Sequence, residues 1–186
     1  PIAVTGATGS LGGLVAADLA AAGARLRLVV RSVERAPRLH GTSVAHATYA
    51  DEVAMTAALQ GVDVLFLVSA SESADRLEQH RSAVAAAAAA GVRHVVYTSF
   101  TGASDTATFT LARDHAATER MLRDSGMSWT FLRDNLYMDV LDDFAGPQGV
   151  LRGPASDGAV AAIARVDVAR VAVTVLLEPA AHAGRI

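Results

Sequence analysis

The chain is 186 residues long, carries a net charge of −3, and contains 52% hydrophobic and 19% charged residues. This apolar share excludes a disordered chain, and the scattered basic residues argue against a nucleic-acid surface, which needs clustered Lys and Arg. The sequence has no cysteine, which excludes disulfides, thiolate metal sites and cysteine nucleophiles. All 16 cationic side chains are arginines, so chemistry that needs a lysine amine, such as Schiff-base formation, is excluded as well.

Short β-branched segments alternate with alanine-rich segments that end at a glycine. The expected strands cover residues 2–5, 26–30, 44–49, 62–68, 92–98 and 129–132. The expected helices cover residues 11–22, 53–60, 74–90, 107–125 and 168–177. We expect Asp51 and Ser73 to cap the second and third helices. The alternation predicts an α/β fold with a doubly wound parallel sheet, which binds ligands at the carboxyl ends of its strands.

The first strand runs directly into a glycine-rich loop that opens the first helix. The loop reads Thr5-Gly6-Ala7-Thr8-Gly9-Ser10-Leu11-Gly12, with glycines at every third position. Glycines in this context permit a tight turn, close approach of the backbone to a pyrophosphate, and close packing of helix on strand. The free N–H groups of the helix terminus favour phosphate. The pattern therefore predicts a dinucleotide site, the alternative being a turn that only packs.

The end of the second strand indicates which dinucleotide binds. NAD sites place Asp or Glu there, whereas this chain has Arg31, with Arg35 one helical turn further on. A guanidinium pairs well with a 2′-phosphate, which favours NADP(H). The alternative is that both arginines are solvated surface charges. Asp51, after the third strand, either accepts a bond from the adenine amino group or only caps the next helix, and the sequence leaves both open.

The regular pattern weakens after residue 137. We therefore expect a Rossmann dinucleotide-binding domain over residues 1–137, followed at residues 138–186 by the start of a smaller C-terminal lobe that looks truncated. His40, His46, His94 and His182 show no metal-ligand spacing, so no metal site is expected.

Several motifs together resemble the NmrA-like branch of atypical short-chain dehydrogenases/reductases, with type 2 NAD(P)H:quinone oxidoreductases as the most similar group. The resemblance rests on the glycine loop, Val30-Arg31 and Asp51, and on three later motifs. These motifs are His94-Val-Val-Tyr-Thr-Ser99, His115-x-x-x-Glu119-x-Met-Leu122 and Trp129-Thr-Phe-Leu-Arg-Asp-Asn135-x-Tyr137.

The resemblance implies a set of cofactor-binding residues. Those expected to hold the pyrophosphate are Gly6, Thr8, Gly9, Ser10, Leu11 and Gly12. It places Arg31 and Arg35 at the 2′-phosphate and Asp51 at the adenine. Those expected to line the nicotinamide ribose are Ser69, Ala70, Thr98 and Ser99.

The Tyr/Lys pair that ordinary short-chain dehydrogenases use for proton transfer is missing. The lysine position carries His115, and the tyrosine position carries Leu111. Direct hydride transfer to a quinone needs no such pair, because the protein mainly positions the reactants and excludes water. His115 could donate a hydrogen bond to a developing oxyanion, or only pack on its helical stripe. Asn135 and Tyr137 could bond and stack on a quinone, or only pack locally, and Phe100 could wall the nicotinamide side.

Two functions remain open at this level. The first is an NADP(H)-dependent oxidoreductase that reduces quinones or similar electrophiles, and the second is a non-catalytic NADP-binding redox sensor of the NmrA type. A relative of sugar-nucleotide epimerases is a weaker third, because the Tyr/Lys pair is missing. We expect a small quinone-like substrate, a cytoplasmic protein and neither nucleic-acid nor membrane partners, since no apolar run approaches the ~20 residues of a bilayer span. A homodimer is compatible with the sequence.

Overall fold

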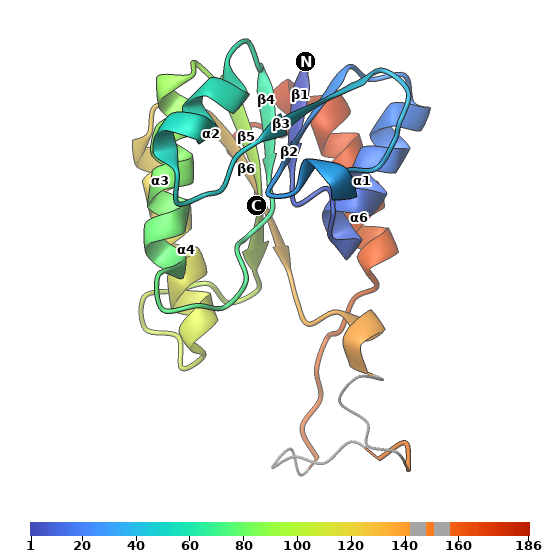
Figure 1. The fold of residues 1–186 in the computed structure, drawn as a ribbon. Coiled ribbons are helices and arrows are strands. Elements are labelled where there is room, and N and C mark those ends of the chain that lie inside the picture. Colours follow the sequence, from blue (N-terminus) through green and yellow to red (C-terminus); the bar gives the residue numbers. More distant parts are fainter. Residues whose placement is uncertain (142–147, 151–156) are drawn as a thin grey trace.

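The structure is a computed structural model that describes residues 1–141, 148–150 and 157–186 (Figure 1). Two stretches of the expected C-terminal lobe, residues 142–147 and 151–156, lie outside the described residues. In the described part of the chain, no helix is both long enough and apolar enough to cross a membrane.

Six parallel strands form the central sheet, in the order β3-β2-β1-β4-β5-β6. The strands are β1 (Ile2–Thr5), β2 (Leu26–Val30), β3 (Thr42–His46), β4 (Val64–Leu67), β5 (His94–Phe100) and β6 (Ser128–Asp134). The order reverses between β1 and β4, so the crossovers run to opposite sides of that point. Such a switch point opens a crevice at the carboxyl ends of the strands. The predicted doubly wound α/β fold is confirmed.

Helices cover both faces of the sheet (Figure 1). They are α1 (Ser10–Ala21), α2 (Glu52–Leu59), α3 (Arg76–Ala89), α4 (Thr110–Asp124) and α6 (Arg165–Leu177), with short 3-10 turns at Val33–Arg35, Met138–Val140 and Pro179–His182. Helices α1 and α6 pack on one face, and α2, α3 and α4 lie side by side on the other. Each face buries its own apolar core, one around Leu19 and Phe66, the other around Met55 and Tyr97.

Helix α6 does not stand apart from the dinucleotide-binding fold. Its buried residues, such as Val168 and Ala172, belong to the same core as Val15 and Leu19 of α1. Residues 165–177, which the sequence assigned to the C-terminal lobe, therefore complete one face of the sheet. For the rest of residues 138–186 the separate lobe stays a prediction.

Strand and helix ends differ from the expected ones by a few residues. Helix α3 begins at Arg76, so Ser73 is not its cap, and the Ser73 hydroxyl instead donates to the Asp75 carboxylate at 2.7 Å. Helix α4 begins at Thr110 rather than at residue 107, and β3 covers residues 42–46 rather than 44–49. Local turn bonds precede both helices, with the Arg76 N–H donating to the Ser73 carbonyl oxygen and the Ala107 N–H to that of Ser104.

Candidate functional site

The glycine loop between β1 and α1 has a geometry that other residues could not adopt. Gly6 has a φ of +63°, a left-handed conformation that side chains disfavour. A Cβ on Gly12 would lie 2.4 Å from the Gly6 carbonyl oxygen, so only glycine lets the helix pack this closely on the loop. Gly9 occupies the N-cap of α1 and has no side chain to bond the first helical N–H groups. These N–H groups point out of the helix terminus and are available to an anion.

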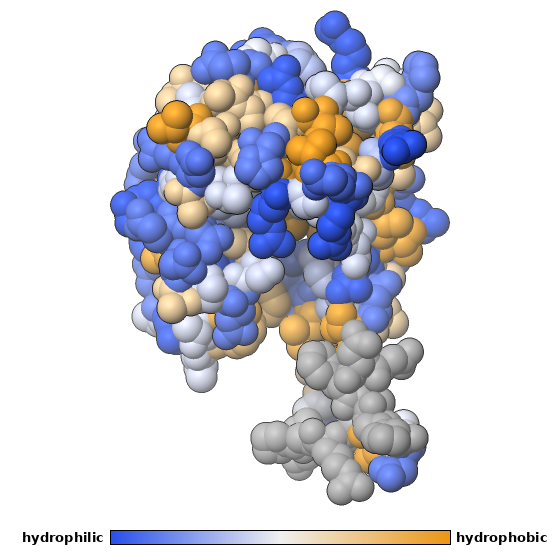
Figure 2. All heavy atoms as spheres, in the orientation of Figure 1, coloured by the Kyte–Doolittle hydropathy of each residue, from blue (hydrophilic) through white to orange (hydrophobic). Residues whose placement is uncertain are grey.

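A cavity of about 610 Å³ opens at this loop. It lies at the carboxyl edge of the sheet, in the crevice created by the switch point. The predicted residues on its wall are Gly6, Thr8, Gly9, Ser10, Leu11, Gly12, Arg31, Arg35, Ser69 and Ala70. Residues that the sequence did not single out complete the wall, among them Tyr49, Val68 and Gln79. Figure 2 shows this side of the molecule hollowed near its centre, with hydrophilic residues around the hollow.

Arg31 and Arg35 contribute the positive charge of the cavity wall. Both side chains are exposed, and within the described residues neither forms a salt bridge. The nearby Glu34 carboxylate accepts a 2.9 Å bond from Ser32 instead. Two exposed guanidinium groups at the end of β2 therefore stand ready for an anionic ligand group.

A buried polar contact supports the inner wall between β1, β3 and β4. The Tyr49 hydroxyl lies 2.6 Å from both the Thr5 hydroxyl and the Val68 carbonyl oxygen. The Val68 N–H donates to the Thr5 hydroxyl at 2.9 Å. Burial raises the pKa of Tyr49 well above its ordinary value, so this phenol stays protonated and acts as a structural donor. These contacts fix the end of β4 against the glycine loop.

Asp51 lies outside the residues that line the cavity and caps α2, as the sequence predicts. Its carboxylate accepts a 2.9 Å bond from the Ala54 N–H. This is the ordinary N-cap contact of a helix. The adenine contact that the sequence also allowed stays a prediction, since a carboxylate can accept several hydrogen bonds at once.

Replacing Asp51 separates these two roles. We expect Asp51→Ala to lower the free energy of unfolding by about 1 kcal/mol, because the cap is lost, whereas Asp51→Ser keeps a capping oxygen and loses much less. Urea titrations of both variants measure this difference. Equal stability of Asp51→Ala and the parent protein would contradict the cap assignment. A loss of NADPH affinity in both variants would show that the carboxylate also contacts the adenine.

Thr98 and Ser99 do not lie on the cavity wall, contrary to the expectation for the nicotinamide ribose. Both are buried, at 2% and 1% exposure. The Thr98 hydroxyl accepts a 2.8 Å bond from the Ser69 N–H, and the Ser99 hydroxyl donates to Glu119 at 2.6 Å. Thr98 therefore acts behind the wall, by holding Ser69 in place.

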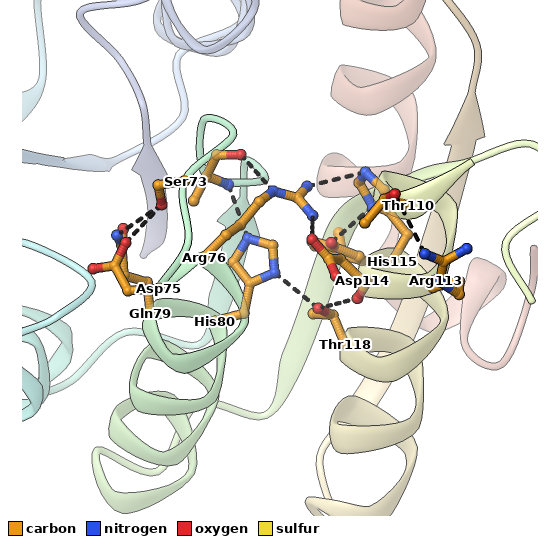
Figure 3. A network of polar contacts seen from close by, with 12 residues as sticks. Ser73, Asp75, Arg76, Gln79, His80, Thr110, Arg113, Asp114, His115 and Thr118 are labelled. Carbon is orange, nitrogen blue, oxygen red and sulfur yellow. Dashed lines mark hydrogen bonds and ion pairs between the residues drawn. The ribbon is translucent and has the colours of Figure 1, made fainter. Parts of the chain in front are cut away.

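Ala70, next on the wall, is held from behind by a network between α3 and α4 (Figure 3). Its N–H donates to the His80 Nε2 at 2.8 Å, and its carbonyl oxygen accepts from the Arg76 Nε at 2.9 Å. Arg76 is only 3% exposed, and its other nitrogens reach the Asp114 carboxylate at 3.2 Å and the His115 Nε2 at 3.1 Å. A buried guanidinium thus ties the cavity wall to α4.

These contacts determine the protonation of both histidines. A backbone N–H and a guanidinium can only donate, so the Nε2 atoms of His80 and His115 must accept and carry no proton. The Nδ1 atoms then donate to Thr118 and Tyr97, each at 2.8 Å. Burial and the Arg76 charge lower the pKa of each histidine to about 3. Both rings are therefore neutral.

The predicted catalytic role of His115 does not agree with this geometry. The side chain is 6% exposed, does not line the cavity, and uses both ring nitrogens in protein contacts. A direct hydrogen bond to a substrate oxyanion would require one of these contacts to break. The alternative of local packing and bonding fits the observed contacts.

Asn135 and Tyr137 also make local contacts rather than line the cavity. The Asn135 side chain accepts from the Leu136 N–H at 2.8 Å. The Tyr137 hydroxyl donates to Asp134 at 2.5 Å, and the Arg165 guanidinium lies over its ring at 5.0 Å. A quinone could not stack on the ring face that Arg165 covers. The alternative hypothesis, that Asn135 and Tyr137 only pack locally, therefore agrees with the structure.

The sequence placed Glu119 of α4 in a family motif but gave this carboxylate no role. Glu119 is 1% exposed and accepts two bonds from Arg133, at 2.8 and 2.7 Å, and one from Arg123 at 3.0 Å. Burial by itself would raise the pKa of Glu119. The bonds from Arg133, Ser99 and Arg123 outweigh this effect, so the pKa of Glu119 is lowered. The cluster ties α4 to β5 and β6. Its sequence signal was a glutamate on the buried stripe of a helix beside Leu122.

Comparison with known proteins gives a consistent assignment. The family described as NAD(P)H-binding matches residues 6–179. Quinone oxidoreductase 2 of Escherichia coli (strain K12) is 42% identical over 192 residues, which cover 100% of this chain and 66% of that protein. The chain thus spans about two thirds of the length of this relative.

Two solved structures share the fold over the same extent. The NADPH-dependent quinone oxidoreductase QOR2 from Escherichia coli, complexed with NADPH, is 41% identical with a TM-score of 0.88 and covers 100% of this chain and 67% of its own. The triphenylmethane reductase of Citrobacter sp., complexed with NADP(H), is 34% identical with a TM-score of 0.90, covering 100% and 68%. The fold that carries the cavity is thus shared with two proteins whose structures were solved in complex with NADPH or NADP(H).

Proposed function

The chain belongs to the NAD(P)H-binding family that matches its residues 6–179, and from this premise we propose that the protein is an NADPH-dependent reductase of quinones or similar electrophiles. The observation that carries the proposal is the 610 Å³ cavity, whose wall combines the glycine loop with Arg31 and Arg35. The glycine loop suits the pyrophosphate of a dinucleotide, and the two arginines suit a 2′-phosphate. The relatives' activities, reduction of quinones and of triphenylmethane dyes, support the choice of acceptor.

The proposal assigns a role to each part of the wall. The backbone N–H groups of residues 10–12 would hold the pyrophosphate, and Arg31 with Arg35 would hold the 2′-phosphate. Ser69 and Ala70 would lie beside the nicotinamide ribose. Thr98, His80 and Arg76 would act indirectly, since they fix the backbone of Ser69 and Ala70.

The residues present suit a reaction in which the protein transfers no proton. When bound, NADPH supplies a hydride, which carries both electrons of the reduction. A quinone that accepts a hydride becomes a hydroquinone anion, and solvent supplies the proton that completes the hydroquinone. The chain has no Tyr/Lys pair, and both ring nitrogens of His80 and of His115 are already bonded, so this side of the site would only orient the reactants and exclude water.

The proposed function is tested by NADPH oxidation in the full-length natural protein. We expect NADPH loss at 340 nm to depend on added 1,4-benzoquinone and to be much faster than NADH loss at the same concentration. Omission of quinone controls for slow oxidation by oxygen. A folded protein that binds NADPH but oxidises neither cofactor with any quinone would contradict the proposal and favour a redox sensor.

A further inference from the structure

Resting on the proposed function, we propose that Phe100 and Phe109 form the surface on which a planar aromatic acceptor stacks. Phe100 ends β5, and Phe109 immediately precedes α4. Their ring centroids lie 5.4 Å apart at an angle of 56°. The Phe109 side chain is 46% exposed, and Phe100 is half-buried. The two rings thus offer aromatic surface to a ligand at the same edge of the sheet as the cavity.

The Phe100 ring is connected to the cofactor cavity through protein contacts on both sides. Along the strand, Phe100 follows Thr98 by two residues, and Thr98 holds Ser69 of the cavity wall. Through the side chains, Arg76 bonds both the Ala70 carbonyl oxygen and His115 (Figure 3), and the His115 ring stacks on Phe100 at 6.0 Å and 25°. Phe100 therefore packs on the network that holds Ala70 of the cavity wall, and the proposal places the approach of the acceptor to the nicotinamide end on this side.

The network behind Phe100 makes it a rigid platform. His115 is fixed by bonds from both ring nitrogens, so the ring that supports Phe100 cannot rotate freely. The aromatic packing continues behind His115. The ring centroids of His115 and Tyr97 lie 5.7 Å apart, and those of Tyr97 and His80 lie 5.8 Å apart. A preorganised aromatic face binds a flat ring without the loss of side-chain freedom that a mobile residue would suffer.

Phe109 occupies a position that its local structure does not favour. It is the N-cap residue of α4, where Ser, Thr, Asp or Asn would bond the helix terminus, and it makes no side-chain cap bond. Its exposed ring also gains little from the core. Such a break with local preference is common at functional positions. A ligand-binding role for the Phe109 ring explains why phenylalanine occupies this N-cap, which helix stability does not explain.

The proposal predicts a specificity that follows ring size and aromaticity. Stacking against two phenyl rings favours naphthoquinones and aromatic dyes over small non-aromatic electrophiles. The pair Phe100→Leu and Phe109→Leu removes the rings but keeps apolar volume, whereas Phe100→Tyr keeps the ring. Val53→Ala, on the outer surface of α2 at 81% exposure, is the matched control.

Equilibrium binding of 1,4-naphthoquinone to the full-length protein saturated with NADP⁺ tests the proposal, because the oxidised cofactor prevents turnover. We expect each leucine variant to weaken naphthoquinone binding by about three- to tenfold, with the NADPH dissociation constant unchanged and Phe100→Tyr and Val53→Ala binding as the parent protein does.

The outcomes distinguish the platform from the proposed function. If the parent protein reduces naphthoquinone and both leucine variants bind it as tightly as the parent does, the platform is wrong and the reductase assignment stands. If the parent protein binds NADPH but neither binds nor reduces any quinone, the proposed function fails, and the platform fails with it. Melting temperatures of the variants within a few degrees of the parent's exclude unfolding as the cause of weaker binding.

Discussion

Arg31→Ala is expected to raise the dissociation constant for NADPH by about ten- to hundredfold and to change that for NADH by less than about twofold. A charge-assisted hydrogen bond contributes roughly 1.5–3 kcal/mol, and each 1.4 kcal/mol is tenfold in affinity. Arg31 follows directly on β2 and lines the cavity, with its guanidinium exposed. NADH lacks the 2′-phosphate, which is the anionic group that this side chain would bind, and its pyrophosphate is expected at the glycine loop.

Arg38→Ala is the matched control for this prediction. Arg38 is exposed, lies on the segment that follows Arg35, and does not line the cavity. The Arg38→Ala substitution removes the same charge as Arg31→Ala. An equal loss of NADPH affinity in these two variants would therefore indicate a general electrostatic effect rather than a 2′-phosphate contact. Fluorescence titration with each cofactor measures the affinities. Equal weakening of NADPH and NADH by Arg31→Ala would contradict the assignment.

Local geometry explains why the sequence predicted the fold and the glycine loop. A parallel sheet needs alternating strands and helices, and the chain shows this alternation from Ile2 to Asp134. The positions of Gly6 and Gly12 follow from steric limits that act within a few residues, and the structure has the expected backbone there. Arg31 could be placed because the end of β2 is defined by its own apolar run.

The polar network behind the cavity could not be predicted, because its members are distant in sequence. His80 and Thr118 are 38 residues apart, and Arg76 and His115 are 39 apart. In the sequence, His115 shares one helical stripe with Leu122, which is compatible with a core position and with a site. Only the packing of α3 against α4 shows that its ring nitrogens are already bonded.

Acidification should test whether His80 and His115 are neutral, as their bonds require. In the folded state His80 and His115 have a pKa of about 3, and the ordinary value is 6.5. Above pH 6.5 neither state binds a proton at these sites. As the pH falls below 6.5, the unfolded chain takes up protons that the folded protein rejects, so the free energy of unfolding decreases. Asp134 opposes this trend. Burial raises its pKa to about 6 in the folded protein, which therefore takes up this proton at a higher pH than the unfolded chain does and gains stability as the pH falls.

A comparison of variants removes the contribution of Asp134, which is the same in each. His115→Gln should destabilise the protein at pH 8, because Arg76 and Tyr97 lose their partner. At pH 5 the parent protein has already lost about 2 kcal/mol through His115, since 1.5 pH units below 6.5 correspond to that energy. The destabilisation by His115→Gln should therefore be about 2 kcal/mol smaller at pH 5 than at pH 8, as measured by urea titration. His40→Gln, at an exposed histidine, should show no such difference. An equal effect of His115→Gln at both pH values would mean that the ring is protonated in the folded protein at pH 5, which would break its bond from Arg76 and leave α4 bound to Arg76 through Asp114.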